Sequence, residues 1–432
     1  MKNPELLSPA GSLKAMRLAF AYGANAVYAG QPRFSLRVRN NEFDLNTLAL
    51  GINEAHAQHK KLYVVANIAP HNAKLKNFVA QMEPVIALKP DAMIVSDPGV
   101  IALLREFFPA MSLHLSVQAN TLNWAAVRFW QAVGIERVIL SRELGLDEIA
   151  EIKQRCPEME LEVFVHGALC MAYSGRCLIS NYINKRDPNQ GACTNACRWE
   201  YNAQSAVEIQ QELIPSTQVK TQAIFVEQAE HPGEKFALEE DEHGSYLFNS
   251  KDLRAVAQVE RLVAIGVDSL KIEGRTKSPY YAAHTAQVYR RAIDDAVAGK
   301  AFNQELLQEL DGLSNRGYTE GFLQRHKQQE LQNYEHGNSH ATSQQLVGEV
   351  LEQLADDYLL IDVKNNFKVQ DQLLLLTPTE NYPLQLVQLL NGQHEPIDVA
   401  PGSGHRVHIR LPFAVVGTQA MLVKILMQHS IE

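Results

Sequence analysis

The cysteines are the residues of this chain whose spacing most directly suggests chemistry. Four of the five fall within one stretch of 28 residues, separated by six, fifteen and three residues: Cys170, Cys177, Cys193 and Cys197. Inert buried thiols are one reading, and disulfides would require an oxidising compartment. The density of the cluster favours a metal site instead. Structural zinc usually takes closely paired cysteines, whereas iron–sulfur clusters tolerate irregular spacing, so both metals stay open, with iron slightly favoured.

The bulk composition predicts an ordinary soluble globular protein. Hydrophobic residues make up 46% and charged residues 21% of the 432 residues. No apolar run approaches the roughly 18 residues needed to cross a bilayer, and the N-terminus lacks the apolar core of a secretory signal. We therefore expect a cytoplasmic protein with reduced thiols and no membrane partner. The net charge of −9 means that a polynucleotide partner would need a local basic surface.

The first 280 residues alternate short β-rich segments with helical patterns. Candidate strands lie at 5–9, 26–30, 62–68, 92–97, 113–119, 137–143, 161–167 and 269–275. Strands that alternate with helices indicate βα units and a parallel sheet. Eight such units predict an α/β fold with a TIM-type (β/α)8 barrel rather than an open doubly wound sheet.

One connection is far longer than a barrel needs. After the seventh strand, an insertion at 168–248 carries the cysteines and a predicted hairpin, and a helix is predicted next at 250–266. The remainder divides into a barrel domain at 1–325, a polar linker at 326–345 and a small C-terminal all-β, barrel-like domain at 346–432.

Barrel enzymes carry their active sites at the carboxyl ends of the strands, where this chain has polar and charged residues. The predicted substrate-binding residues are Arg37, Arg39, Asn67, Gln118, Arg142 and Arg275. Several guanidinium groups around one mouth suit a small polyanion, although each arginine could instead pair within the rim. The predicted catalytic residues are His166, Lys271 and Glu273. For His166, a hydrogen-bonding role competes with a role as general base.

Several segments resemble one known family. Glu162, Phe164, Gly167, Cys170, Ser174, Gly175, Cys177 and Ser180 form the pattern E-x-F-x-x-G-x-x-C-x3-S-G-x-C-x-x-S. This pattern is similar to the signature of the collagenase-like, U-type peptidase family of unknown catalytic type. PELLSPAGS, NIAPHNAKLK, HLSVQAN, YINKRDPNQG, CTNACRWEY and SLKIEGRTKS look like its branch of tRNA uridine hydroxylation proteins. The resemblance runs to about residue 325 and continues more weakly beyond it.

The resemblance implies a specific activity. It implies oxygen-independent, prephenate-dependent hydroxylation of the wobble uridine of tRNA at C5, giving 5-hydroxyuridine. It also implies a [4Fe-4S] cluster on Cys170, Cys177, Cys193 and Cys197, and leaves open accessory sulfur or electron-transfer proteins. Prephenate carries two carboxylates, which suits the predicted arginine-lined mouth.

Two other functions compete with RNA hydroxylation. The first is the peptidase activity of the family label, against which stands the absence of Ser-His-Asp and H-E-x-x-H spacings. The second is a zinc-stabilised RNA-binding module without catalysis of its own.

Overall fold

The computed structural model of the chain describes residues 2–30, 33–36, 42–170, 172–174, 176–177, 180, 187–190, 250–324, 343–354, 358–411 and 419–426. Of three short strands in the insertion it describes the backbone alone: β8 (Ile224–Glu227), β9 (Lys235–Asp241) and β10 (Gly244–Tyr246). β9 and β10 pair as an antiparallel hairpin, as predicted. The predicted linker at 326–345 lies mainly outside the described residues, so the proposed domain boundaries stay predictions.

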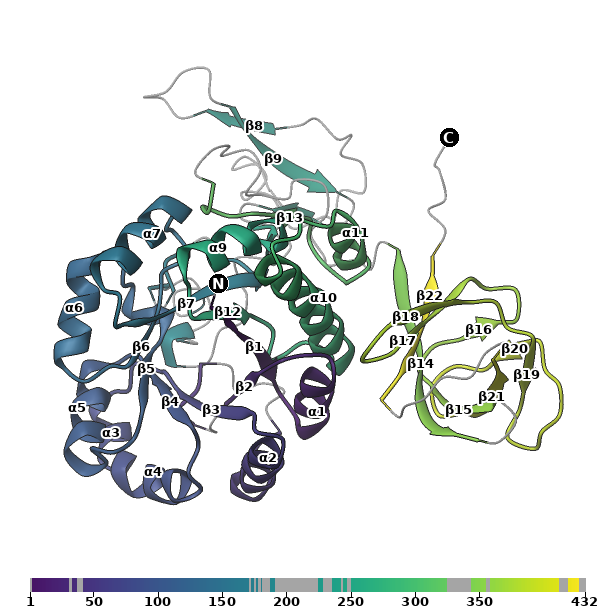
Figure 1. Cartoon of the computed structure of the whole chain (residues 1–432), viewed down its shortest axis with the longest axis horizontal. Coiled ribbons are helices and arrows are strands. Elements are labelled where there is room, and N and C mark those ends of the chain that lie inside the picture. The colour runs from purple at the N-terminus through teal and green to yellow at the C-terminus, as the bar shows by residue number, and fades with distance from the viewer. Residues whose placement is uncertain are drawn as a thin grey trace, which may run out of the picture.

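Eight parallel strands close into a barrel (Figure 1). They are β1 (Glu5–Ala10), β2 (Ala26–Gly30), β3 (Lys61–Ala66), β4 (Ala92–Val95), β5 (Leu113–Leu115), β6 (Arg137–Ile139), β7 (Glu160–Ala168) and β12 (Ser269–Ile272). β12 pairs with both β1 and β7, which closes the sheet and confirms the predicted TIM-type fold. Several strands end earlier than predicted. After β5, for example, the chain leaves the ladder and forms the 3-10 turn η1 (Val117–Ala119).

Helices follow the strands and cover the outside of the barrel (Figure 1). They are α1 (Leu13–Ala21), α2 (Leu45–Ala57), α3 (Asn72–Leu75), α4 (Phe78–Ala87), α5 (Pro98–Phe107), α6 (Trp124–Ala132), α7 (Leu146–Arg155), α9 (Val259–Ile265), α10 (Pro279–Val297) and α11 (Glu305–Asp311). Their starts have local causes in the sequence. Ser12 caps α1 by accepting a hydrogen bond from the Ala15 amide, and Asp97 caps α5 in the same way.

The helix predicted at 250–266 is wrong in its first half. Asp252–Arg254 form strand β11, which pairs antiparallel with the end of β7 and parallel with β13 (Tyr318–Thr319). A 3-10 turn, η5 (Val256–Gln258), then leads into the short helix α9. Residues 252–254 thus form a strand because they pair with the free edge at the end of β7, although their periodicity alone predicts a helix. This tertiary contact overrides the local sequence propensity.

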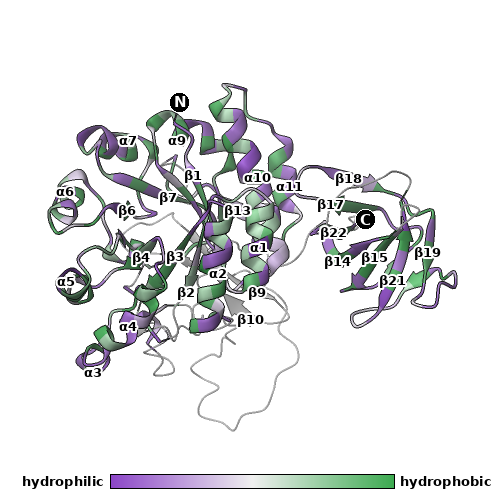
Figure 2. Cartoon of the chain, turned by 60° about the horizontal axis from the view of Figure 1, so that its bottom comes forward, coloured by the Kyte–Doolittle hydropathy of each residue, from purple (hydrophilic) through white to green (hydrophobic). Residues whose placement is uncertain are grey.

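The C-terminal part is all-β, as predicted. Seven antiparallel strands lie in the order β18-β17-β22-β14-β15-β21-β19, and a second pair joins β16 (Phe367–Lys368) to β20 (Val399–Ala400). The seven are β14 (Gln344–Gln353), β15 (Tyr358–Val363), β17 (Leu373–Leu376), β18 (Asn381–Leu384), β19 (Gln388–Leu390), β21 (Arg406–Arg410) and β22 (Met421–Ile425). Buried and partly exposed residues alternate along β15, so one face of this strand is buried. Figure 2 shows hydrophobic and hydrophilic residues mixed along the strands of this part. Among the described strands, β18 and β19 are the two ends of this order, so it does not close into a barrel.

The β domain packs against the outside of the barrel, beside α1 and α10 (Figure 1). The Tyr22 hydroxyl donates to the carbonyl oxygens of Leu376 and Gln419, at 3.0 Å each. Gln287 of α10 donates to the Thr377 carbonyl oxygen at 2.8 Å. Met421 of β22 belongs to the same hydrophobic cluster as the barrel core. None of the helices that the structure describes is long and apolar enough to span a membrane.

Candidate functional site: a charged barrel interior beneath a cysteine-bearing segment

The interior of the barrel contains a chain of ion pairs instead of aliphatic layers alone. Arg137 of β6 contacts Glu5 of β1 at 2.6 Å and Glu162 of β7 at 3.2 Å. Glu162 in turn lies 2.7 Å from the Lys271 ammonium of β12. Arg137, Glu162 and Lys271 are buried, and Glu162 is fully inaccessible. Buried charges persist only when they are paired, so these strands are held in register by charge as well as by backbone hydrogen bonds.

Lys271 lies at the upper end of this chain of ion pairs, beneath two aromatic rings. Its ammonium nitrogen is 4.4 Å from the ring centre of Tyr28 and 5.3 Å from that of Phe164. Burial lowers the pKa of Lys271, and the nearby Arg137 and Arg275 lower it further, although the attraction of Glu162 opposes them. Lys271 is therefore a desolvated amine at the carboxyl end of a barrel strand, where TIM barrels perform their chemistry.

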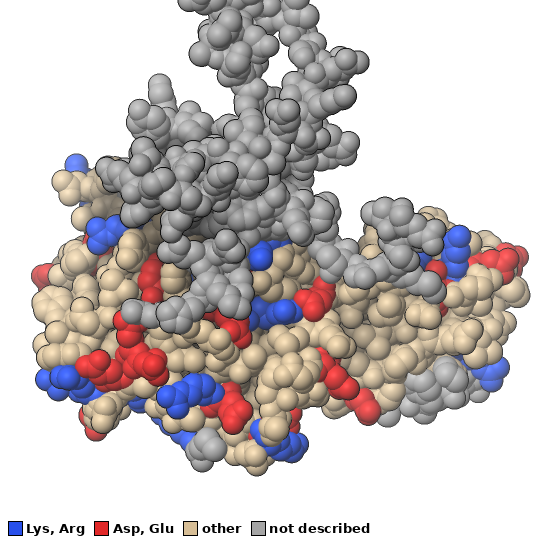
Figure 3. All heavy atoms as spheres, turned by 90° about the horizontal axis from the view of Figure 1, so that it is seen from above, with Lys and Arg blue, Asp and Glu red and all other residues tan. Residues whose placement is uncertain are grey.

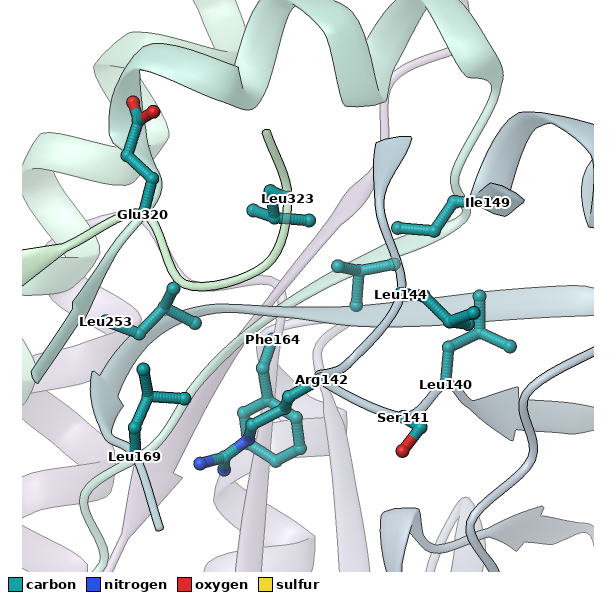
Figure 4. Close-up of a pocket in the computed structure, with 11 residues that line it drawn as sticks. Leu140, Ser141, Arg142, Leu144, Ile149, Phe164, Leu169, Leu253, Glu320 and Leu323 are labelled. Carbon is teal, nitrogen blue, oxygen red and sulfur yellow. The ribbon is translucent and has the colours of Figure 1, made fainter. Parts of the chain in front are cut away.

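Two predicted arginines lie on these same rings. The Arg142 guanidinium stacks 3.9 Å from the centre of the Phe164 ring (Figure 4) and donates to the Ala168 carbonyl oxygen at 2.5 Å. Arg275 lies 5.8 Å from the centre of the Tyr28 ring and donates to the Ser35 hydroxyl at 2.6 Å. Within the described residues, the buried Nε of Arg142 has no hydrogen-bond partner. The mouth thus carries two guanidinium groups above one amine, an arrangement suited to a small carboxylate.

Gly30 makes room for one of these arginines. A Cβ atom at this position would overlap Nη1 of Arg275, so a side chain on Gly30 would displace the guanidinium. Arg37 and Arg39, predicted in the same rim loop, lie outside the described residues.

The two predicted amides lie together at the opposite side of the rim. The Asn67 side chain accepts from the Leu36 amide at 3.2 Å and donates to the Ser116 hydroxyl at 3.1 Å. That hydroxyl donates to the Gln118 side chain. Asn67 and Gln118 are therefore coupled through one serine, and these bonds order the loops after β3 and β5.

His166 does not point into the barrel. Its ring packs against Tyr281 and Tyr289 of α10 and against Tyr318, with ring centres 5.5–5.8 Å apart. The side chain is fully buried, and this burial lowers its pKa to about 3. This environment favours the hydrogen-bonding and packing role over the predicted role as general base.

Glu273, the third predicted catalytic residue, follows β12 and contacts the end of β7. Its carboxylate accepts from the Ala168 amide at 3.3 Å, and its own amide donates to the His166 carbonyl oxygen at 2.8 Å. Gly167 allows this approach, because it has a φ of +110° and a Cβ there would lie 2.6 Å from the Glu273 carbonyl oxygen. Of the three, Lys271 alone combines burial with a position beneath the mouth.

The segment after β7 crosses the mouth of the barrel. Asn120, after β5, donates to the Ser174 carbonyl oxygen at 3.1 Å. Asn189 donates to the Cys177 carbonyl oxygen at 3.1 Å, and its own carbonyl oxygen accepts from the Ala69 amide, after β3, at 3.2 Å. Because β3 lies across the barrel from β7, these bonds hold the described residues 172–174, 176–177 and 187–190 over the mouth.

The described part of this segment presents two unbridged thiols. Cys170 is exposed, Cys177 is partly exposed, and neither is in a disulfide. Cys193 and Cys197 lie outside the described residues, and no group of three or more metal-ligating side chains occurs among the residues that are described. The two thiols fit a thiolate-bound metal in their chemistry and in their access to solvent. The fifth cysteine, Cys156, is buried, and its thiol donates to the Trp124 carbonyl oxygen. It is therefore not a candidate metal ligand.

A small pocket lies beside Arg142, between the ends of β6 and β7 and residues 320–323 (Figure 4). It is lined by Leu140, Ser141, Arg142, Leu144, Ile149, Val163, Phe164, Leu169, Leu253, Glu320 and Leu323. This lining is mainly aliphatic. Phe164 and Arg142, which stack on each other, are both part of this lining.

Arg137 and Glu162 are site residues that the sequence reasoning missed. Their signal is a charged residue at an alternating position inside an otherwise apolar strand, as in ELEVFV and RVIL. On the face of the molecule shown in Figure 3, cationic and anionic side chains of the described residues lie interspersed.

Comparison with known proteins places the chain in a family. Residues 11–333 match the family model described as Peptidase family U32. Residues 342–422 match the model described as Peptidase family U32 C-terminal domain. The chain belongs to peptidase family U32.

Relatives in this family carry names from RNA modification. The chain is 58% identical to "tRNA hydroxylation protein P" of Escherichia coli K12, over 98% of this chain and 97% of that protein. It is 55% identical to the protein of the same name from Haemophilus influenzae, over 98% and 96%. It is also 33% identical to a 23S rRNA 5-hydroxycytidine synthase of E. coli, over 67% of this chain and 39% of that protein.

Proposed function

We propose that this U32-family protein is a tRNA-modifying enzyme that hydroxylates the wobble uridine at C5. The observation that carries the proposal is full-length identity above one half with proteins named for tRNA hydroxylation. The reaction is oxygen-independent and requires prephenate, as the sequence resemblance implies.

A [4Fe-4S] cluster is part of this proposal. Its ligands are Cys170, Cys177, Cys193 and Cys197, of which the first two are unbridged thiols on the segment above the barrel mouth. A bound cluster of this kind would supply electron transfer. Because C5 is not acidic, its hydroxylation needs either such a redox step or nucleophilic activation of the ring. The chain itself contributes a fixed position for the segment, through Asn120 and Asn189.

The anionic small molecule is assigned to the mouth. Arg142 and Arg275 supply two guanidinium groups for the two carboxylates of prephenate. The Nε of Arg142, which has no hydrogen-bond partner among the described residues, can donate to one of these carboxylates. The tRNA approaches the same rim. The wobble base is presented unstacked from its neighbours, since enzymes that modify bases take them out of the stack.

The test is nucleoside analysis of tRNA from a strain that lacks this protein. Complementation with the wild-type chain should restore 5-hydroxyuridine-derived nucleosides, whereas Cys170→Ser and Cys177→Ser should not. Cys156→Ala is the matched control, because this thiol is buried on another part of the barrel, and it should complement. Undiminished 5-hydroxyuridine in the deletion strain would refute the proposed function.

Anaerobic purification separates the iron–sulfur proposal from a zinc-stabilised module. A brown protein with broad absorption near 400 nm and about four irons per chain supports the cluster. A colourless protein with stoichiometric zinc refutes it. Cleavage of a peptide library that survives removal of the cysteines would instead favour the peptidase label.

A further inference from the structure

Lys271, on β12 beneath the mouth, is an amine rather than a conventional acid–base group. Lys271 is buried, and its nitrogen lies between the Tyr28 and Phe164 rings, at 4.4 and 5.3 Å from their centres. A surface lysine is protonated at neutral pH and inert as a nucleophile. A desolvated lysine that has cationic neighbours becomes reactive toward carbonyl compounds.

A proton acceptor lies within hydrogen-bonding distance of this amine. Glu162 Oε1 is 2.7 Å from the Lys271 nitrogen, while Glu162 Oε2 faces Arg137 at 3.2 Å. Glu162 therefore has one oxygen to exchange a proton with Lys271 and one that is held by a permanent cation. Glu162 can therefore accept a proton from Lys271 through Oε1 while its contact with Arg137 through Oε2 keeps the carboxylate in position.

The two guanidinium groups around the amine determine what kind of carbonyl compound fits. Arg142 lies over the Phe164 ring and Arg275 over the Tyr28 ring, and the Lys271 nitrogen lies near the same two rings. Carboxylates bind guanidinium groups, and an amine condenses with a ketone. The three side chains together select a molecule that carries both groups, which is an oxo acid.

We propose that Lys271 forms an imine with the keto group of an oxo acid bound by Arg142 and Arg275. The ammonium proton passes to Glu162, and the neutral amine attacks the carbonyl carbon to form the C–N bond. The carbonyl oxygen takes up protons and leaves as water, so that one protonated imine and one water form from one ammonium and one ketone. No oxidant or reductant is needed. The proposal rests on the proposed function only for the identity of the acid, since prephenate contains a pyruvoyl ketone.

The experiment traps the imine by reduction. The full-length protein is incubated with pyruvate, phenylpyruvate or prephenate and sodium cyanoborohydride, and is then analysed by intact-mass spectrometry and peptide mapping. An irreversible mass increment equal to the acid less one oxygen atom is expected, on the peptide that contains Lys271. Phenyllactate keeps the carboxylate but lacks the ketone, so it should leave the mass unchanged.

Two lysine variants separate a specific site from general amine reactivity. Lys271→Arg retains a cation beside Glu162 and should abolish labelling. Lys60→Arg is the matched control, because Lys60 is partly buried at the opposite end of the barrel and burial lowers its pKa to about 8. Labelling of Lys271 that survives Lys60→Arg supports the proposal. Absence of labelling with all three acids, or equal labelling of Lys60 and Lys271, overturns it.

This readout needs neither tRNA nor a metal, so it is independent of the test of the proposed function. Trapping at Lys271 together with unchanged tRNA in the deletion strain would keep the oxo-acid site and reject RNA hydroxylation. The reverse result would reject the imine alone.

Discussion

The carboxylate of Glu162 and the ammonium of Lys271 lie 2.7 Å apart inside the barrel, and solvent reaches almost none of either side chain. The pair joins β7 to β12, the two strands that close the barrel on this side. Structure and reactivity are therefore connected at one contact. A change that breaks the pair leaves a buried charge uncompensated, and its cost is paid by the whole fold.

Glu162→Ala should lower the free energy of unfolding by about 3 kcal/mol or more, because Lys271 and one side of Arg137 lose their partner. Urea unfolding followed by circular dichroism measures the change. Glu151→Ala removes the exposed pair with Arg155 on α7 and should cost less than about 0.5 kcal/mol. Equal costs for the two variants would contradict the buried network.

Stability should depend on pH through His166. Burial lowers the pKa of this histidine to about 3, below the value of about 6.5 in the unfolded chain. The unfolded state thus binds more protons between these values, so the contribution of neutral His166 is complete above pH 6.5 and is lost as the pH falls toward 3. The slope from this group is at most about 1.4 kcal/mol per pH unit. His166→Gln should reduce the slope of the unfolding free energy between pH 6 and 4, and an unchanged slope would argue against the buried, neutral ring.

Gly30→Ala should disturb the mouth without replacing any charged residue. The new methyl group would overlap the Arg275 guanidinium, which can shift because it is the far end of a flexible side chain. We therefore expect a small loss of unfolding free energy, about 1 kcal/mol, and weaker binding of the proposed carboxylate ligand. Thermal unfolding and prephenate titration by calorimetry measure both effects. Gly402→Ala is the control, since nothing lies within 4 Å of a Cβ at that position. Unaltered binding in Gly30→Ala would remove Arg275 from the ligand site.

Asn189→Ala should weaken the attachment of the cysteine segment. The side-chain amide donates to the Cys177 carbonyl oxygen, and its loss frees the chain beside a proposed cluster ligand. We expect lower iron content after anaerobic reconstitution and faster bleaching in air. Asn391→Ala, in the β domain, removes a comparable turn bond and should leave iron content unchanged. Equal iron content in both variants would mean that this bond does not support the metal site.

The positions of the barrel strands could be predicted from the sequence better than the directions in which their side chains point. Apolar, β-branched runs that end in polar residues located all eight strands, because such segments fit a pleated and buried surface. The same reading placed His166 at the mouth, because it is a polar residue at the end of a predicted strand. The register of β7 against β12 shifts there, from Lys271 opposite Phe164 to Ile272 opposite His166. One additional residue reverses the alternation, and His166 turns to the helix layer.

The ion pairs show a different limit of the sequence. Glu162 and Arg137 are recognisable as charged residues within strands, but their pairing depends on which strands become neighbours across the interior. Strand β11 shows the same limit, because it exists only where the end of β7 offers an edge. Local propensity cannot contain contacts that closure of the barrel creates.

The chain leaves and re-enters the barrel at one point, because Ala168 and Asp252 are partners in the ladder between β7 and β11. The pairing of β7 with β12, which closes the barrel, therefore does not depend on the path of the residues between Ala168 and Asp252. Loss of the proposed cluster should therefore leave the barrel folded, because the pairing of β7 with β12 does not involve the cysteines.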